Sequence, residues 1–243
     1  MIELLALPGL PEVRPGDDLA RLIQDTGTEL TATDVLVVAH KVVSKAEGRL
    51  VDLNDVVPGE RARRLAADHG KDPRHTEVVL SEAAQLVRAD GGRLICRTRH
   101  GFVCANAGVD QSNAAAPDQL ILLPVDPDAS ARALRAALPG RPAVIITDSF
   151  GRAWRNGQCE VAIGVAGLHA LEDWRGRPDA QGREMHASII AIADEIAAAA
   201  DLPRGKTSRE PAVRVRGLHR HITDEDGPGV APLVRRLEDD LFR

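Results

Sequence analysis

Short aliphatic and β-branched runs alternate along the chain with segments whose apolar residues recur every three or four positions. The runs predict strands, and the periodic segments predict amphipathic helices. The expected strands cover residues 3–7, 35–39, 93–99, 102–106, 120–123, 143–147, 161–165 and 212–216. The expected helices cover residues 18–25, 60–68, 77–87, 130–138, 185–200 and 231–241. This alternation predicts an α+β (mixed α/β) fold in which helices pack on mixed, largely antiparallel sheets.

The connections between these elements indicate how the chain is divided. His100 and Gly101 separate two expected strands by a short turn, which predicts an antiparallel hairpin and excludes a purely parallel sheet. No internal repeat or low-complexity linker interrupts the pattern. We therefore expect one domain over residues 1–243, with a soft internal boundary near residues 85–92.

Composition and charge narrow the class of protein. Hydrophobic residues make up 44% and charged residues 28%, a balance that excludes disorder and fibrous architectures. The net charge of -5 and the 2% of aromatic residues argue against a nucleic-acid partner, which requires a basic surface and stacking rings. The N-terminus lacks signal-peptide features, and no apolar stretch approaches the roughly 20 residues of a membrane helix. We therefore expect a cytoplasmic protein without a membrane partner.

Acidic residues gather directly after the expected strands. They are Asp110, Asp126, Asp128 and Asp148. Ligand sites are commonly assembled at strand ends, and magnesium and manganese prefer carboxylate oxygens. Asp110 and Asp148 are therefore candidate metal ligands. The alternative is a cap or turn, most of all for Asp128, which directly precedes an expected helix.

A basic cluster follows the expected strand at residues 35–39. Its members are His40, Lys41, Lys45 and Arg49. Clustered positive charge suits an anionic ligand, although a solvent-exposed charge run is the commoner explanation of such a segment.

A second basic segment follows Asp148 and Ser149 and contains Arg152 and Arg155. We expect these four residues to share one strand-end loop, a composition suited to a metal-bound phosphoryl group and an acidic substrate. No GxSxG elbow or HExxH pair is present, so the sequence predicts no covalent nucleophile of those classes.

A third candidate for phosphate binding is the loop that contains Gly205, Lys206 and Thr207. It imitates the end of a P-loop, but position 200 is Ala200 rather than glycine, which excludes a true P-loop. Such a loop still offers backbone N–H groups, an ammonium and hydroxyls to a phosphate. A solvated connection before a strand is the alternative.

Four segments together resemble the coenzyme F420 gamma-glutamyl ligase family. They are VVSKAEGR at 42–49, NAGVDQSN at 106–113, LPVDPDAS at 123–130 and TDSFGRAWRNGQCEVAIGVAG at 147–167. The resemblance implies the family's own fold, a homodimer, and a GTP-dependent ligase that needs manganese or magnesium. Such an enzyme joins L-glutamate to the lactyl-phosphate side of a deazaflavin precursor through an acyl phosphate, releasing GDP and phosphate.

The resemblance also implies roles for particular residues. Asp110 and Asp148 correspond to metal ligands, Ser149 corresponds to a hydroxyl contact to a second metal, and Lys45 corresponds to a catalytic lysine. The expected GTP contacts are Leu10, Pro11, Glu12, Val13, His40, Lys41, Lys45, Asn113, Arg204, Gly205, Lys206, Thr207, Ser208, Arg209 and Glu210. Lys206 stands where some members carry an acidic metal ligand. The flavin-binding C-terminal domain of some actinobacterial members is not expected here.

Two other readings use the same residues. A metal-dependent phosphohydrolase would use Asp110 and Asp148 with water as the acceptor. A non-catalytic module would bind GTP without turnover. Dependence of GTP turnover on glutamate distinguishes the ligase from both.

Overall fold

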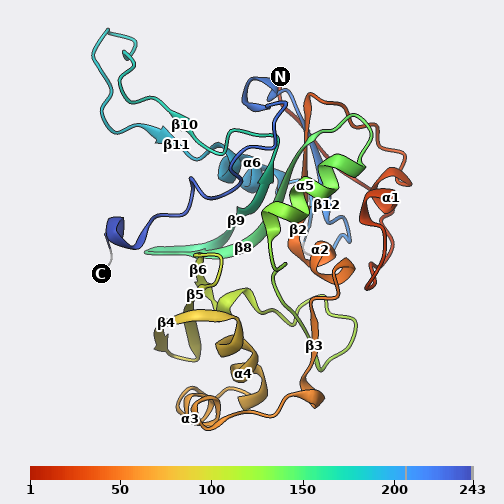
Figure 1. Cartoon of the computed structure of the whole chain (residues 1–243), viewed down its shortest axis with the longest axis vertical. Coiled ribbons are helices and arrows are strands. Elements are labelled where there is room, and N and C mark those ends of the chain that lie inside the picture. The colour runs from red at the N-terminus through yellow and green to blue at the C-terminus, as the bar shows by residue number, and fades with distance from the viewer. Residues whose placement is uncertain (206, 242–243) are drawn as a thin grey trace.

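A five-stranded sheet forms the centre of the protein. The structure is a computed structural model, and it describes residues 1–205 and 207–241. The strands lie in the order β1 (Glu3–Ala6), β12 (Ala212–Arg216), β2 (Asp34–Ala39), β8 (Ala143–Arg152) and β9 (Arg155–Ala166) (Figure 1). β2 and β8 run parallel, and the other neighbours in this sheet run antiparallel. The predicted α+β class with mixed, largely antiparallel sheets is confirmed.

Helices pack against this sheet and enclose the larger hydrophobic core. They are α1 (Leu19–Gln24), α2 (His40–Ala46), α5 (Pro127–Ala137) and α6 (Ile192–Ala200). α5 packs on β8 and β9, and α6 packs mainly on β9. Leu36 of β2 and Ile145 of β8 are fully buried between these layers. Aliphatic side chains supply most of this core, because the chain has so few aromatic residues.

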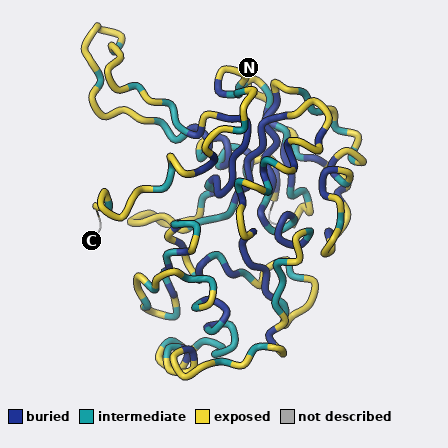
Figure 2. The backbone as a smooth tube through the Cα atoms, in the orientation of Figure 1, coloured by how far each residue is buried: buried dark blue, intermediate teal, exposed yellow. Residues whose placement is uncertain are grey.

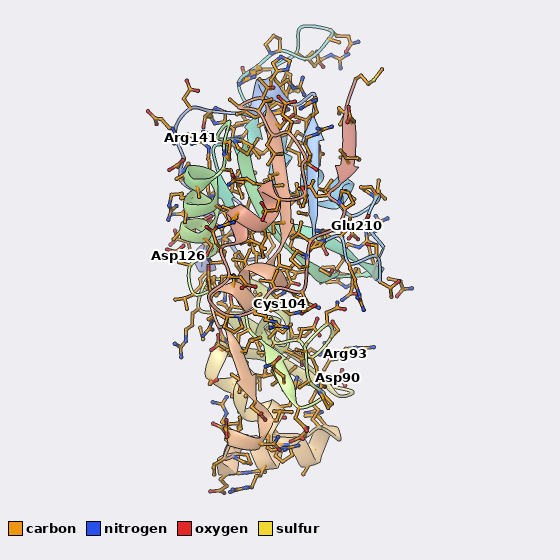
Figure 3. All side chains as sticks on the ribbon, turned by 90° about the vertical axis from the view of Figure 1, so that its right-hand side faces the viewer. Asp90, Arg93, Cys104, Asp126, Arg141 and Glu210 are labelled. Atoms are coloured by element: carbon orange, nitrogen blue, oxygen red, sulfur yellow. The ribbon has the colours of Figure 1, made fainter. Side chains whose placement is uncertain are left out.

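A smaller unit adjoins the central sheet and has a hydrophobic core of its own (Figure 1). Its elements are β3 (Leu50–Asp52), η1 (Leu53–Asp55), α3 (Glu60–His69), α4 (Pro73–Glu82), β4 (Ala83–Asp90), β5 (Arg93–Thr98), β6 (Val103–Ala105), η2 (Asn106–Gly108) and β7 (Gln119–Ile121). β4, β5 and β6 form an antiparallel sheet, and β3 pairs with β7. Residues 85–92, the expected internal boundary, lie in β4 and its turn to β5. Cys104 of β6 lies where this unit meets the central sheet (Figure 3).

The remaining elements extend from this body. β10 (Glu172–Asp173) pairs with β11 (Ile189–Ile190), and the loop between them projects outward and is largely exposed (Figure 2). Two short 3-10 helices, η3 (His219–His221) and η4 (Leu237–Asp239), lie in the C-terminal segment. In the part of the chain that the structure describes, no helix combines the length and apolar character needed to cross a membrane.

Three predicted helices are wrong in part or entirely. The helix expected at 77–87 ends at Glu82, because residues 83–90 pair with β5 as strand β4. The helix expected at 185–200 begins at Ile192, because residues 189–190 pair with β10. The segment at 231–241 forms turns and η4 instead of a helix. In the first two segments, pairing with another strand, β5 or β10, overrides the local helical periodicity.

Two residues fix the start of α5 against β9. A Cβ atom added at Gly164 would lie 2.3 Å from the backbone oxygen of Pro127, so only glycine allows this approach. Asp128 then accepts hydrogen bonds from the backbone N–H groups of Val165 at 2.8 Å and Val230 at 3.1 Å. Asp126 caps α5 by accepting from the Ala129 N–H at 2.8 Å. Both aspartates therefore have structural roles at the start of α5.

Candidate functional site

The parallel pairing of β2 with β8 creates the first contact of the site. Ala39 at the end of β2 is in register with Thr147, so α2 begins beside Asp148. The buried ring of His40 places Nε2 3.3 Å from Asp148 Oδ1, a close polar contact without the alignment of a hydrogen bond. Its Nδ1 lies 3.2 Å from the hydroxyl of Ser44 one turn later. The imidazole is thus held between its own helix and the carboxylate.

The next residue of α2 holds the second carboxylate. Lys41 Nζ lies 2.6 Å from Asp110 Oδ2 and 2.5 Å from the hydroxyl of Ser112. Backbone hydrogen bonds with Ile121 fix Asp110 beside β7. Burial acts to raise the pKa of Asp110, but hydrogen bonds from Lys41 and Ser112 outweigh it, so the net pKa is lowered. Asp110 is therefore ionised at neutral pH.

Lys45, the second lysine of α2, meets the loop that follows β1. The Lys45 ammonium donates to Glu12, and the Lys45 side chain is only 8% exposed whereas that of Glu12 is 62% exposed. Leu10 and Val13 belong to the hydrophobic core, and Pro11 is exposed. The loop expected to contact a nucleotide therefore lies against α2.

The basic segment is not a solvated charge run. Lys41 and Arg49 have side chains that are 19% and 24% exposed, and each has an acidic partner. Arg49 binds Glu82 at 2.7 Å and donates to the Leu123 carbonyl at 2.9 Å. Lys41, Lys45 and Arg49 are therefore partly buried, ion-paired side chains, which corrects the surface-charge alternative.

A buried network lies behind Asp148 on the central sheet. Ser149 donates to Glu160 on the adjacent strand β9, and these residues are in register. Arg204 binds Glu160 at 2.9 Å, the Thr147 hydroxyl at 3.2 Å and Asp201 at 3.1 Å. The network therefore joins the loop after α6 to the strand that carries Asp148.

Sequence patterns did not reveal Glu160 or Ser112. Glu160 lies inside the family segment at 147–167, but no residue type or spacing singled it out, because its role depends on cross-strand pairing with Ser149. Ser112 had a usable signal, because an Asp followed two positions later by Ser commonly forms a local hydrogen-bonded turn. Its N–H donates to Asp110 Oδ1 at 2.8 Å.

The expected strand-end loop with two arginines does not exist. β8 and β9 continue as a hairpin, and Arg152 pairs with Arg155 near its exposed tip. Alternation along β8 also directs Asp148 and Ser149 to opposite faces. One ion cannot bind both of these side chains from a single position.

The other residues that were expected to contact GTP lie mostly in exposed loops. Asn113 is exposed in the loop after Asp110, with a positive φ of 61°. In the loop after α6, Gly205, Thr207, Ser208 and Arg209 are exposed, and Glu210 is half-buried. Lys206 lies outside the described residues.

Cysteine chemistry does not contribute a nucleophile at this site. Cys104 lies close enough to Asp148 to feel its charge. Burial first, and that charge second, raise the pKa of the Cys104 thiol to about 12. The thiol is therefore protonated at neutral pH, so Cys104 is not an activated nucleophile.

These features define a class of protein: an α+β chain in which two carboxylates, Asp148 and Asp110, contact the consecutive basic residues His40 and Lys41 at the start of α2. The chain belongs to the F420-0:gamma-glutamyl ligase family, whose model matches residues 9–217. The family resemblance seen in the four sequence segments is thereby confirmed.

Three relatives illustrate how completely the family covers the chain. The coenzyme F420:L-glutamate ligase of Methanopyrus kandleri is 47% identical over 96% of this chain and 94% of its own length. The protein of the same name from Methanothermobacter thermautotrophicus is 42% identical over 100% of this chain and 99% of its own. The protein of the same name from Natronomonas pharaonis is 44% identical over 100% of this chain and 95% of its own length.

Proposed function

We propose that the protein is a coenzyme F420:L-glutamate ligase, which forms an amide bond between a carboxylate of the deazaflavin acceptor F420-0 and the amine of L-glutamate. The relatives that match over nearly the whole chain carry this name. The observation that carries the proposal is that consecutive residues of α2, His40 and Lys41, contact Asp148 and Asp110. This arrangement gathers both signs of charge where an anionic cosubstrate and a cation must meet.

A divalent cation, magnesium or manganese, fits the donor set. Asp110 and Asp148 supply hard carboxylate oxygens, and Asp110 is ionised. Within residues 1–205 and 207–241, no group of three or more His, Cys, Asp and Glu side chains is placed to hold a metal. Two carboxylates are enough for magnesium, which usually keeps waters and binds substrate phosphates as well. When bound, such a cation neutralises phosphate charge and orients the phosphoryl group. Ser149, on the opposite face of β8, would serve a separate ion.

GTP is the proposed source of activation. Lys41 binds Asp110, and Lys45 lies one turn further along α2 and contacts Glu12. The loop at 10–13 and the exposed part of the 204–210 loop offer further contacts. Transfer of the γ-phosphoryl group breaks its bond to GDP and forms an acyl phosphate on the acceptor carboxylate. The glutamate amine then attacks the acyl carbon, phosphate leaves, and the amine releases a proton to solvent. Charge neutralisation and positioning supply most of the rate enhancement in such transfers.

Further proposals follow from the same family reading. The chain acts as one domain and as a homodimer in the cytoplasm. Light scattering of the purified protein measures the mass in solution, and a monomer at all concentrations contradicts the dimer.

The test of the function is a product analysis. Purified protein is incubated with F420-0, L-glutamate, GTP and manganese, and the amide product is identified by mass while GDP and phosphate are quantified. We expect one GDP for each amide bond formed and little GDP when glutamate or F420-0 is omitted. Equal GDP release without glutamate contradicts the ligase and supports the phosphohydrolase. Saturable GTP binding without any turnover supports the non-catalytic module.

A further inference from the structure

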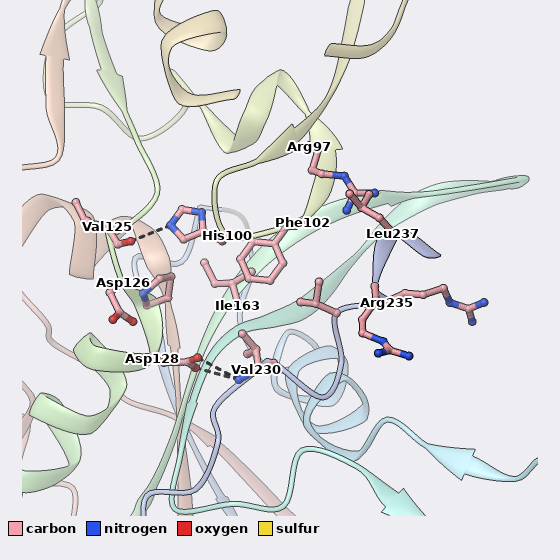
Figure 4. A pocket seen from close by; sticks show the side chains of 14 residues that line it. Arg97, His100, Phe102, Val125, Asp126, Asp128, Ile163, Val230, Arg235 and Leu237 are labelled. Carbon is pink, nitrogen blue, oxygen red and sulfur yellow. Dashed lines mark hydrogen bonds between the residues drawn. The ribbon is translucent and has the colours of Figure 1, made fainter. Parts of the chain in front are cut away.

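A cavity of about 520 Å³ lies apart from the His40 and Asp148 contact, between the β5–β6 hairpin, the start of α5 and the C-terminal segment. Phe102, Ile163 and Val230 form its apolar wall, and Arg97 and Arg235 stand at its border (Figure 4). Cavities of about 300–1,000 Å³ with apolar walls and a few polar groups are typical small-molecule sites. Its size and lining therefore suit an organic ligand.

Aromatic rings meet at this cavity in a chain that has few of them. The rings of His100 and Phe102 stack with centroids 5.6 Å apart and an angle of 18°. Phe102 also meets Phe150 of β8 edge-on at 6.1 Å. Stacked rings at a cavity wall favour a flat aromatic ligand.

Two polar atoms of the lining lack hydrogen-bond partners among the described residues. His100 Nε2 lies 3.0 Å from the Pro124 carbonyl and 3.1 Å from the Val125 carbonyl, so this nitrogen carries the ring proton. The other ring nitrogen, Nδ1, is then an acceptor, and it is buried without a donor. Arg97 Nε is a donor that is buried without an acceptor. A buried polar atom without a partner is costly, so a ligand that supplies both partners is favoured.

The charges at the border favour an anionic group on that ligand. Arg236 is paired with Glu238 and Asp239, at 2.7 Å and 3.0 Å. Arg97 forms an ion pair with Asp240 at 3.6 Å, whereas Arg235 donates only to the Asp239 carbonyl in the contacts described. The two aspartates that line the cavity already have partners, because Asp126 caps α5 and Asp128 accepts hydrogen bonds from backbone N–H groups. Positive charge therefore remains available at the opening.

We propose that this cavity binds the flat heteroaromatic ring of the acceptor, with a ring carbonyl accepting from Arg97 and a ring N–H donating to His100. The inference rests on the proposed function, because a deazaflavin has such a carbonyl and N–H edge and carries an anionic phosphodiester. Phe102 connects the cavity to the carboxylates through Phe150. Phe150 and Asp148 share one face of β8 and are separated by about 7 Å along the strand.

The test combines kinetics with direct binding, using F420-0 as the probe. Arg97→Lys keeps the positive charge but removes the guanidinium Nε–H. We expect it to raise the KM for F420-0 and the Kd from a fluorescence titration by roughly tenfold, while the KM for GTP stays unchanged. Arg88→Lys is the matched control, because Arg88 is an exposed arginine of β4 outside the cavity. It should behave like the parent protein.

A second pair of variants separates charge from shape. Leu237 lines the cavity and is 49% exposed, so substitutions there leave the core intact. Leu237→Glu should weaken F420-0 binding several-fold, whereas Leu237→Lys should not. Unchanged F420-0 binding in both Arg97→Lys and Leu237→Glu overturns the cavity assignment. If the parent protein binds F420-0 but forms no amide, the proposed function fails, and the titration still decides the cavity.

Discussion

His40 Nε2 and Asp148 Oδ1 lie 3.3 Å apart, although 108 positions separate the two residues in the chain. The contact arises because parallel strands β2 and β8 bring their carboxyl ends to the same edge of the sheet. His40 is buried and the Asp148 side chain is 15% exposed, so the carboxylate is partly shielded from water. A substitution that removes the charge of Asp148 but keeps its shape therefore tests the site directly.

Asp148→Asn should lower ligation by roughly a hundredfold or more, because the amide keeps the shape of the side chain but loses the charge that attracts a cation. The measurement is GTP-dependent amide formation across a manganese titration, with thermal unfolding as the check of folding. Asp18→Asn is the control, since Asp18 is an exposed N-cap residue of α1 and asparagine caps equally well. A folded Asp148→Asn protein with parental activity contradicts the assignment.

Arg204→Met should raise the KM for GTP more than it lowers kcat. The Arg204 guanidinium already binds Thr147, Glu160 and Asp201, so it acts by holding the following loop against β8. Arg204→Lys should give a smaller effect, because an ammonium can keep only part of this fork of hydrogen bonds. A kcat loss with an unchanged KM for GTP argues against this positioning role.

Arg216→Met should destabilise the protein by about 2–3 kcal/mol at neutral pH. Arg216 binds the fully buried Asp34 at 2.7 Å and 2.9 Å. Loss of one partner of a fully buried ion pair costs about 3–5 kcal/mol. The expected loss of about 2–3 kcal/mol is smaller because the Arg216 side chain is 40% exposed and solvent screens the pair. Urea unfolding of parent and variant measures the difference.

The same pair gives a pH dependence of stability. Burial acts to raise the pKa of Asp34, but hydrogen bonds from Arg216 and Thr31 outweigh it and hold the pKa below the usual 3.8. A lowered pKa stabilises the folded state at pH values above 3.8, and this contribution is lost as the pH falls through the folded-state pKa. The difference in stability between parent and Arg216→Met should therefore narrow as the pH falls below 3.8. A difference that grows over this range contradicts the sign.

Gly164→Ala should destabilise the fold by about 1–3 kcal/mol or more, because its Cβ would overlap the Pro127 carbonyl and push α5 away from β9. Gly151→Ala is the matched control in the neighbouring strand, where an added Cβ meets nothing within 4 Å. Denaturant unfolding of both variants provides the comparison. Equal stability of the two variants would show that α5 adapts without cost.

Local sequence was sufficient to predict those elements whose hydrophobic pattern favours the same secondary structure as their tertiary contacts. The strand predicted at 212–216 is observed at those positions, because its alternating apolar residues suit a buried strand paired on both sides, with β1 and β2. The turn at His100 and Gly101 and the fold class are also correct for this reason. The family segments are readable because their residues are close together in sequence.

Tertiary structure decided the elements and contacts that depend on distant residues. Ala39 of β2 is in register with Thr147 of β8 although the two are far apart in sequence, and Lys41 meets Asp110 across 69 positions. Glu160, Arg204 and the aromatic cavity likewise depend on elements that meet only after folding. Helical periodicity and capping act over about four residues, whereas strand pairing and ion pairing are selected by the packing of the whole chain. The sequence therefore determined which chemical groups the protein carries, and the fold determined which of them meet.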